Sequence, residues 1–307
     1  MKKVVITGAT GMVGKELVDA CIERQIQVLA IVRPNSKNMS RLPKSDLLQI
    51  CECELDKLNN HDFSIYGNDW DVFYHMAWNN TSNQYRNAIE YQALNIGYSL
   101  DAINLGEKMG CKKFIGAGSQ AEFGITDVER ISIDVHSNPV TAYGISKLAA
   151  EKLTILWAQQ HNMICIWGRI FSAYGQFDLP TTMISSSIDK MLSGEKTSYT
   201  AGIQIWDYLY STDVAQAFLL MGEKSQESKA YCVGSGIGRP LHEFITEMRD
   251  AIDPNLPLGL GDIPYNGPVL NLWADITPLK EDTGFEPKVS FAEGIRKTIE
   301  FQKGEKS

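Results

Sequence analysis

The chain has 307 residues, of which 44% are hydrophobic and 21% charged, a composition that excludes a disordered or collagen-like protein. Its 37 acidic residues outnumber 29 lysines and arginines, and the net charge of −8 has the wrong sign for a protein that binds nucleic-acid phosphates. No segment approaches the roughly 20 apolar residues of a membrane helix, and the start does not read as a signal peptide, so we expect a cytoplasmic protein without a membrane partner. The cysteines and histidines lack metal-ligand spacing, and we predict no metal site.

Short apolar runs alternate with longer amphipathic stretches over the first 170 residues. The runs that we predict to be strands are 4–6, 28–32, 47–51, 72–74, 114–115 and 163–167. Uninterrupted apolar strands fit a parallel sheet that helices cover on both faces. Long helices are predicted over 86–109 and 142–162, and the first is apolar on two faces, which calls for two packing partners. We therefore predict an α/β fold with a Rossmann-type, doubly wound parallel sheet.

The alternation ends near residue 171. Prolines and glycines cluster between residues 254 and 268, which predicts a long loop, and short helices are predicted over 241–252 and 292–302. We expect an NADP-binding domain of residues 1–171 with a returning segment near 205–235. Residues 172–204 and 236–307 would form a smaller, irregular substrate-binding domain.

A glycine-rich turn follows the first predicted strand and precedes a helical segment over 15–23. Its glycines are spaced by three residues, and such a turn lets the backbone approach a pyrophosphate while the helix N-terminus directs free N–H groups at it. The spacing has one residue more than the common Gly-x-Gly-x-x-Gly pattern. The residues that we predict to hold the dinucleotide here are Gly8, Thr10, Gly11, Met12, Val13 and Gly14.

The end of the second predicted strand carries no acidic residue that would bind the ribose hydroxyls of NAD. Arg33 stands there instead, with Ser36 and Lys37 close behind, and a guanidinium pairs well with a 2′-phosphate. The sequence therefore favours NADP(H) over NAD(H). After the third strand, Glu54 and Leu55 are candidates for the adenine contact, and Asp56 competes with Glu54 for it.

Tyr143 and Lys147 lie four residues apart, on one face of a predicted helix. A lysine cation stabilises a phenolate and lowers the pKa of the phenol toward neutral pH, which makes it usable for acid–base catalysis. Ser119 ends another predicted strand, and the C-terminal ends of parallel strands line the ligand crevice. We predict that Ser119, Tyr143 and Lys147 are catalytic, and that Tyr143 and Lys147 also contact the cofactor.

Together these motifs resemble the extended short-chain dehydrogenase/reductase superfamily, in its nucleotide-sugar-modifying NAD-dependent epimerase/dehydratase branch. The segment from His75 to Ala77 resembles the family's His-x-Ala turn, and the segment from Arg169 to Gly175 its Arg-x-Phe-Asn-x-Tyr-Gly run. The further cofactor contacts that the resemblance implies are Met76, Ala77, Asn95 and Phe171. The substrate contacts that it implies are Trp78, Asn79, Gln120, Glu122, Phe123, Ser172, Trp206 and Arg239.

Two positions depart from the family pattern. Ser172 stands where the family has an asparagine that contacts the substrate diphosphate, and Trp206 where it often has an arginine. Arg239 then becomes the first candidate for the diphosphate. Trp206 is either a stacking platform for a base or sugar or a core aromatic.

The resemblance implies NADPH-dependent reduction of a keto group, at C4, of a nucleoside-diphosphate 6-deoxy sugar. The alternative is a nucleotide-sugar 4-epimerase or dehydratase that uses bound NAD(P). Gln120 and Ala121 stand where a dehydratase has an Asp-Glu pair, which disfavours that option. The second alternative is a non-catalytic NADP-sensing regulator. It is disfavoured because such a protein would not need Ser119, Tyr143 and Lys147. The helices that carry Asn95 and Tyr143 resemble the pair that forms the family's subunit contact, so we expect a homodimer.

Overall fold

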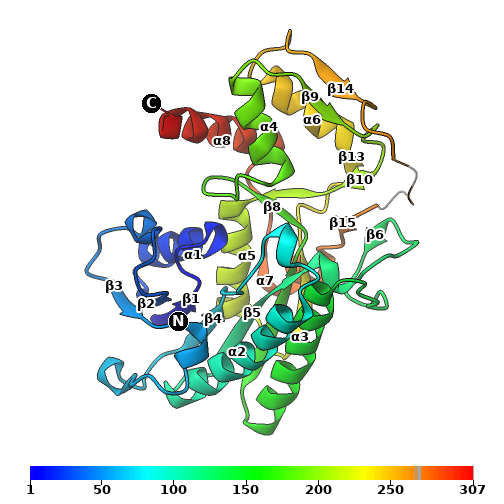
Figure 1. The fold of residues 1–307 in the computed structure, drawn as a ribbon. Coiled ribbons are helices and arrows are strands. Elements are labelled where there is room, and N and C mark those ends of the chain that lie inside the picture. The colour runs from blue at the N-terminus through cyan, green and yellow to red at the C-terminus, as the bar shows by residue number, and fades with distance from the viewer. Residues whose placement is uncertain (266, 268–270, 307) are drawn as a thin grey trace.

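The computed structural model describes residues 1–265, 267 and 271–306 and shows two lobes, one above the other in Figure 1. The lower lobe is built on a seven-stranded sheet in the order β12-β7-β5-β4-β1-β2-β3, and all neighbouring strands are parallel. The strands are β1 (Lys3–Thr7), β2 (Gln27–Val32), β3 (Leu48–Glu52), β4 (Val72–His75), β5 (Lys113–Ser119), β7 (Ile164–Ile170) and β12 (Lys229–Val233). The predicted doubly wound α/β fold is confirmed.

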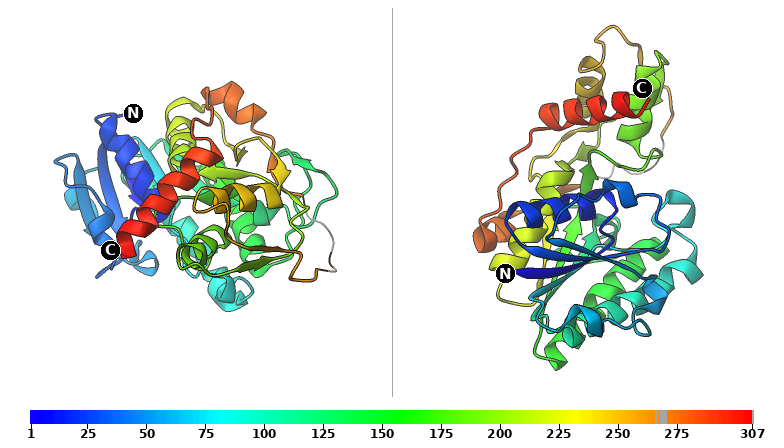
Figure 2. Two further views of the ribbon diagram at one scale, coloured as in Figure 1. Left: turned by 90° about the horizontal axis from the view of Figure 1, so that it is seen from above. Right: turned by 90° about the vertical axis from the view of Figure 1, so that its left-hand side faces the viewer.

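Helices cover both faces of this sheet, as Figure 2 shows in its side view. Helices α1 (Met12–Glu23) and α5 (Ser211–Lys224) pack on one face, and α2 (Ile89–Lys108) and α3 (Ala142–Gln160) on the other. Successive strand residues point to opposite faces, so Val4 packs in the core below α1 and Val5 in the core below α2. Both faces are apolar because neither is exposed to water.

The helices begin at positions that differ slightly from the sequence prediction. Helix α1 begins at Met12 and includes Gly14, so the glycine turn is shorter than expected. Helix α2 begins at Ile89, because a short 3₁₀ helix at Asn83–Tyr85 occupies the residues just before it. Helix α3 begins at Ala142, as predicted.

The upper lobe has its own small core. It contains helices α4 (Met183–Leu192), α6 (Leu241–Asp250) and α8 (Phe291–Lys306) and the strand pairs β9 (Thr197–Tyr199) with β14 (Leu258–Leu260) and β10 (Ile205–Trp206) with β13 (Arg239–Pro240). Strand β14 lies inside the stretch predicted as a loop, and residues 266 and 268 of that stretch lie outside the described residues.

Several segments join the lobes. Strands β8 (Ser172–Tyr174) and β11 (Tyr208–Tyr210) pair, as do β6 (Arg130–Ile131) and β15 (Trp273–Ala274). Within the returning segment near 205–235, helix α5 and strand β12 rejoin the lower lobe. Helix α7 (Thr277–Thr283) packs on α5 and β12, so this part of the C-terminal segment also lies with the sheet. The exact domain division stays a prediction.

The strand order places several functional segments at one edge of the sheet. Strand β1 lies between β2 and β4, where the order reverses, and the loops after such strands form the ligand crevice of doubly wound folds. The C-terminal ends of β1, β4, β5 and β7 therefore meet at the edge that faces the upper lobe (Figure 1). In the part of the chain that the structure describes, no helix has the length and apolar character needed to cross a membrane.

Candidate active site

The glycine turn after β1 packs tightly against the loop after β4 and against the first turn of α1. Gly8 has φ +70°, and a Cβ there would lie 2.7 Å from the backbone nitrogen of Ala77. A Cβ on Gly14 would lie 2.1 Å from the carbonyl oxygen of Gly8. Gly11 is exposed and caps α1 without a side-chain hydrogen bond. The first N–H groups of α1, at Met12 and Val13, thus have no side-chain cap, and the turn fits a pyrophosphate.

The end of β2 presents two cations. Arg33 and Lys37 are exposed, and within the described ranges neither forms an ion pair; Ser36 is half-buried between them. An acidic side chain is also near, since the Glu52 carboxylate at the end of β3 accepts a hydrogen bond of 3.4 Å from the Asn35 N–H.

The two residues predicted to contact adenine follow β3. Glu54 is half-buried at the start of a short 3₁₀ helix, whereas Leu55 packs in the core below α2. The Glu54 side chain is therefore accessible to a ligand, whereas the Leu55 side chain is almost inaccessible.

Ser119 and Tyr143 come together where β5 ends and α3 begins. Thr141 caps α3 by accepting a hydrogen bond of 3.1 Å from the Gly144 N–H, which places Tyr143 in the first turn. Burial raises the pKa of Tyr143, and a hydrogen bond with the Ser119 side chain acts in the opposite direction. The structure therefore places the predicted phenol and hydroxyl in contact.

Lys147 lies beside this pair, in contact with β5 and with the loop after β4. Its Nζ donates a 2.5 Å hydrogen bond to the Ala117 carbonyl and lies 3.7 Å from the centre of the Trp78 ring. Burial lowers the pKa of Lys147 to about 7, while the charge of Glu122 acts to raise it. The role that the sequence predicts for Lys147, to lower the pKa of Tyr143, stays a prediction.

Arg86 is the cation that acts to lower the pKa of Tyr143, although burial outweighs it and leaves that pKa raised. The guanidinium carbon of Arg86 lies 4.7 Å from the centre of the Tyr143 ring, whereas Lys147 Nζ lies 5.9 Å from it. In addition, the Arg86 carbonyl accepts a 2.9 Å hydrogen bond from the Tyr143 N–H. Sequence reasoning missed Arg86, because nothing in its local pattern distinguishes it from a surface arginine.

The loop after β4 is fixed by two buried amides on α2. Gln92 accepts a hydrogen bond of 2.9 Å from the Trp78 indole N–H, and Trp78 in turn lies edge-on to the Tyr143 ring. Asn95 accepts a 2.7 Å bond from the Asn79 N–H and donates to the Asn79 carbonyl. Asn95 therefore holds the loop in place. Met76 and Ala77, which begin this loop, are half-buried beside the glycine turn.

A buried charged network lies below Ser119. Arg169 contacts the carboxyl groups of Glu122 at 2.9 Å and Glu151 at 2.8 Å. Glu122 also accepts hydrogen bonds from the Ser119 N–H, at 2.6 Å, and from the Trp167 indole, at 3.2 Å. The sequence analysis missed this network, although Glu151 lies four residues after Lys147 on the same helix and the spacing signalled a shared face.

The structure places Glu122 and Phe123 in the interior, although both were predicted to contact the substrate. Glu122 is fully buried in the network, and Phe123 packs with Phe171 at a ring distance of 6.0 Å. Neither side chain offers a surface to a ligand, so the structure does not support a substrate contact for them. Phe171, predicted to contact the cofactor, is likewise almost entirely buried.

The remaining predicted substrate contacts lie along the boundary between the lobes. Gln120 donates a long hydrogen bond of 3.5 Å to the Ser172 hydroxyl, and its buried Oε1 has no hydrogen-bond partner in the described part of the chain. Trp206 on β10 is half-buried opposite Arg239 on β13. Arg239 forms ion pairs with Glu243 at 3.1 Å and with Glu247 at 2.8 Å. Its charge is thus already engaged, and a diphosphate contact there stays a prediction.

The sequence matches the profile of the NAD dependent epimerase/dehydratase family over residues 4–234. A putative UDP-glucose 4-epimerase of Methanocaldococcus jannaschii is 25% identical over 312 residues, which cover 98% of both chains. Human dTDP-D-glucose 4,6-dehydratase is 22% identical over 98% of this chain and 89% of its own length.

Solved structures agree with this fold. The UDP-N-acetylglucosamine 4-epimerase of Methanobrevibacter ruminantium, in complex with UDP-N-acetylmuramic acid, superposes with a TM-score of 0.89 at 22% identity over 99% of each chain. The UDP-glucuronic acid 4-epimerase of Bacillus cereus, in complex with NAD, has a TM-score of 0.82 at 20% identity over 98% of this chain and 96% of its own.

Proposed function

Because this chain belongs to the NAD dependent epimerase/dehydratase family, whose members are oxidoreductases of the extended short-chain dehydrogenase/reductase class, we propose that it is a nucleotide-sugar 4-epimerase. The contact between Ser119 and Tyr143 beside the glycine turn carries this proposal. The loop after β4 supports the same proposal, because Ala77 lies against Gly8 of the glycine turn and Trp78 lies against the ring of Tyr143, the proposed acid–base residue.

In this reaction Tyr143 takes the proton of the sugar 4-hydroxyl and later returns it. Ser119 would donate a hydrogen bond to the same sugar oxygen and keep that oxygen close to Tyr143. Arg86 stabilises the negative charge that Tyr143 carries after it loses its proton. Lys147, next to Trp78, would reach the ribose of the cofactor. A bound oxidised nicotinamide dinucleotide would supply the hydride acceptor for C4, and its reduced form the hydride donor for the opposite face.

The cofactor that we propose is NADP(H), held by the glycine turn, with Arg33, Ser36 and Lys37 at the 2′-phosphate. The lack of an acidic residue at the end of β2 and the unpaired charge of Arg33 among the described residues support it. The B. cereus neighbour binds NAD, and Glu52 lies near the same loop, so NAD(H) is the competing choice.

The comparisons support an epimerase better than the reductase that the sequence resemblance favoured. They also include a 4,6-dehydratase. A dehydratase needs a further acid–base pair to remove water across C5 and C6, but Gln120 and Ala121, which stand at the positions of that pair, cannot exchange a proton. These two positions favour the epimerase.

Two further assignments belong to the proposal. Residues 1–171 with 205–235 would hold the cofactor, and most of 172–204 and 236–307 the sugar nucleotide. Apolar side chains exposed on α2 and α3 support a homodimer that these helices form.

A direct assay tests the proposal. The purified protein is incubated with UDP-glucose, UDP-N-acetylglucosamine and UDP-glucuronic acid, each with NADP⁺ or NAD⁺, and the C4 stereochemistry of the sugars is followed by NMR. We expect interconversion of the two C4 epimers without net change in the cofactor. A stoichiometric fall in NADPH absorbance with a 4-keto-6-deoxy sugar nucleotide would show a reductase instead. No turnover with any sugar nucleotide would indicate a sensor.

Substitution of Tyr143 by Phe removes the acid–base hydroxyl and keeps the ring. We expect turnover to fall about 10²- to 10⁴-fold, the usual loss for a general acid–base group, while cofactor binding changes little. Stopped-flow or steady-state kinetics measure the first quantity and fluorescence titration the second. Unchanged turnover would remove Tyr143 from the mechanism.

A further inference from the structure

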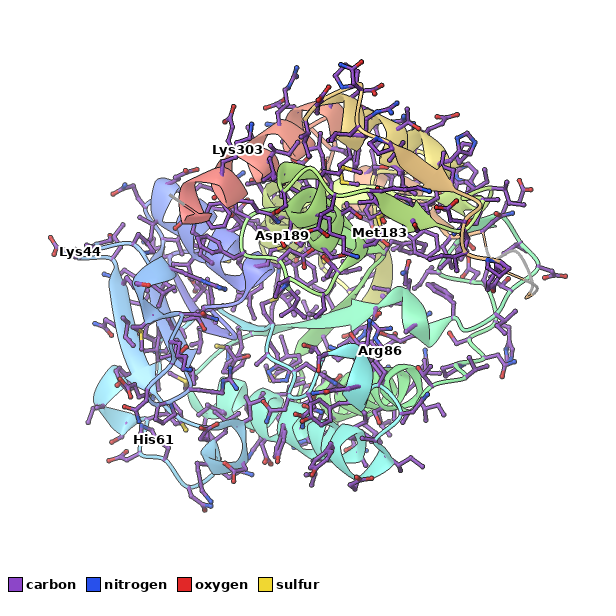
Figure 3. All side chains as sticks on the ribbon, turned by 45° about the horizontal axis from the view of Figure 1, so that its top comes forward. Lys44, His61, Arg86, Met183, Asp189 and Lys303 are labelled. Atoms are coloured by element: carbon purple, nitrogen blue, oxygen red, sulfur yellow. The ribbon has the colours of Figure 1, made fainter. Side chains whose placement is uncertain are left out.

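Arg86 lies between the short 3₁₀ helix at Asn83–Tyr85 and the first turn of α2. Figure 3 labels it in the lower lobe, together with Met183 and Asp189 of α4 in the upper lobe. The guanidinium stacks on the Tyr143 ring, and the Arg86 carbonyl binds the Tyr143 N–H. Arg86 is therefore held against the candidate acid–base residue by both its backbone and its side chain.

The side-chain N–H groups of Arg86 have no hydrogen-bond acceptor among the described residues. Its Nε is buried and has no acceptor, and over residues 1–265, 267 and 271–306 its side chain forms neither an ion pair nor a hydrogen bond. Arg169 and Arg239, by contrast, each contact two carboxyl groups. The Nε–H group of Arg86 has thus lost contact with water without gaining a hydrogen-bond acceptor, which is unfavourable.

We propose that Arg86 binds an anionic oxygen group of the substrate, a phosphate or a carboxylate, beside Tyr143. A planar guanidinium matches both groups through paired, charge-assisted hydrogen bonds. This inference rests on the proposed function, because a sugar nucleotide supplies the oxyanion, either from its diphosphate or from a carboxylate on the sugar. Since Glu243 and Glu247 engage Arg239, Arg86 is the better placed of these two arginines to take a ligand anion.

The test measures dissociation constants by calorimetry in the presence of the oxidised cofactor. The ligands are UDP, UDP-glucose and UDP-glucuronic acid, and the proteins are the wild type, Arg86→Gln, Arg86→Lys and Arg130→Gln. The last is a matched control, because Arg130 also lies over an aromatic ring, Trp273, but pairs with Asp275 outside the site. Cofactor affinity and thermal midpoint are recorded for each variant to verify that it is folded.

We expect Arg86→Gln to weaken binding of at least one ligand about 10- to 100-fold, the effect of losing charge-assisted hydrogen bonds. Arg86→Lys keeps the charge but lacks the paired N–H donors of a guanidinium, so it should lose less affinity. Arg130→Gln should bind the ligands like the wild type. Equal losses for all three ligands identify the diphosphate as the bound group. A loss confined to UDP-glucuronic acid identifies the sugar carboxylate.

Other outcomes overturn the inference, and they separate it from the proposed function. If the wild type binds these ligands and both folded Arg86 variants bind them equally well, Arg86 does not contact the substrate, and the epimerase proposal is unaffected. If Arg86→Gln does not fold, the test rests on the affinities of Arg86→Lys compared with those of the wild type. Unchanged affinity of Arg86→Lys for all three ligands would then contradict the proposed contact. If the wild type binds none of them, the proposed function fails for UDP sugars and this inference fails with it.

Discussion

The carboxyl groups of Glu122 and Glu151 share the single guanidinium of Arg169. Burial raises the pKa of Glu122 to about 8, and a hydrogen bond with Glu151 acts in the same direction. Burial acts to raise the pKa of Glu151 as well, but Arg169 and that hydrogen bond outweigh it and leave the pKa lowered. At neutral pH, Glu122 thus holds the proton and Glu151 the charge, since one cation does not neutralise two buried carboxylates.

Replacing Glu122 by Gln should therefore leave the fold intact at neutral pH. The amide still accepts the Ser119 N–H through its oxygen and donates to Glu151, as the protonated acid does. Glu122→Ala leaves the Ser119 and Trp167 donors unpaired and opens a cavity, so we expect it to lower the free energy of unfolding by about 2–4 kcal/mol. Urea unfolding of both variants measures this, and equal stabilities would contradict the network.

The raised pKa of Glu122 also predicts that the stability of the wild type depends on pH. The pKa of Glu122 in the folded state, about 8, is above its ordinary value of 4.5, so its contribution to stability is fully present below pH 4.5 and is lost as pH rises toward 8. The free energy of unfolding of the wild type, relative to Glu122→Gln, should fall across this window. Urea unfolding of both proteins at intervals of pH measures the difference. Parallel curves would show that Glu122 is ionised throughout.

The proposed preference for NADP(H) can be tested at Arg33. Arg33→Ala should raise the dissociation constant of NADPH by about 10-fold or more and change that of NADH little, because only the former loses a guanidinium–phosphate pair. Fluorescence titration with both cofactors measures the ratio. Glu52→Gln is a useful companion variant: it should improve NADPH binding, since it removes a negative charge near the same loop. Equal effects of Arg33→Ala on both cofactors would refute the 2′-phosphate contact.

Helices α2 and α3 bury polar residues and expose apolar ones. On α2, Gln92 and Asn95 are buried, whereas Leu94 is 53% exposed. On α3, Lys147 is buried and Leu156 is 51% exposed. The polar faces point inward because they build the site. The outward apolar faces lie on two helices that pack against each other, which is the arrangement expected of a subunit contact.

We therefore predict that Leu94→Arg combined with Leu156→Arg converts a dimer into a monomer. Burying two arginines without partners in an apolar contact is unfavourable enough to separate the subunits. Sedimentation velocity at micromolar concentration measures the mass. Ile65→Arg is the control, because Ile65 is equally apolar and 75% exposed but lies in a separate 3₁₀ turn. A monomeric wild type would contradict the prediction.

At the scale of helices and strands, the sequence predicts where the elements lie better than it predicts which polar side chains they direct into the site. The strands follow from continuous apolar runs, and α3 begins at Ala142, where the sequence predicts a long helix to begin. Ser119, Tyr143 and Lys147 meet as predicted, because β5 and α3 end and begin at one edge of the sheet. The Arg86 contact is not predictable from the sequence, since it depends on how a short 3₁₀ turn directs one side chain onto α3.

At the scale of the whole molecule, the candidate site lies where the two lobes meet. The lower lobe follows from sequence patterns, because its repeating strands and helices have regular hydrophobic periods. The upper lobe does not, since its short strand pairs β9 with β14 and β10 with β13 join residues far apart in the chain. Substrate contacts drawn from this lobe, such as Trp206 and Arg239, therefore carry less support from sequence than the catalytic residues.

Phe177 links the lobes close to the cofactor cradle. Its ring lies 4.7 Å from that of Phe301 on α8 and 4.5 Å from the guanidinium carbon of Arg41, which donates a 3.2 Å hydrogen bond to the Thr10 carbonyl. Phe177 has φ +62°, an uncommon conformation for a residue with a side chain, which its contacts must stabilise. The side chain thus connects the upper lobe to the glycine turn.

Phe177→Ala should loosen both sides of this connection. We expect hydrogen exchange to increase in the turn at Met39–Arg41 and in α8, and cofactor binding to weaken several-fold, because Arg41 loses the ring that holds it against Thr10. Phe177→Gly, which relieves the positive φ but also lacks the ring, should behave similarly if contacts rather than backbone strain matter. Leu179→Ala, in the same loop but exposed, is the control. Faster exchange confined to the loop itself would show that Phe177 does not couple the lobes.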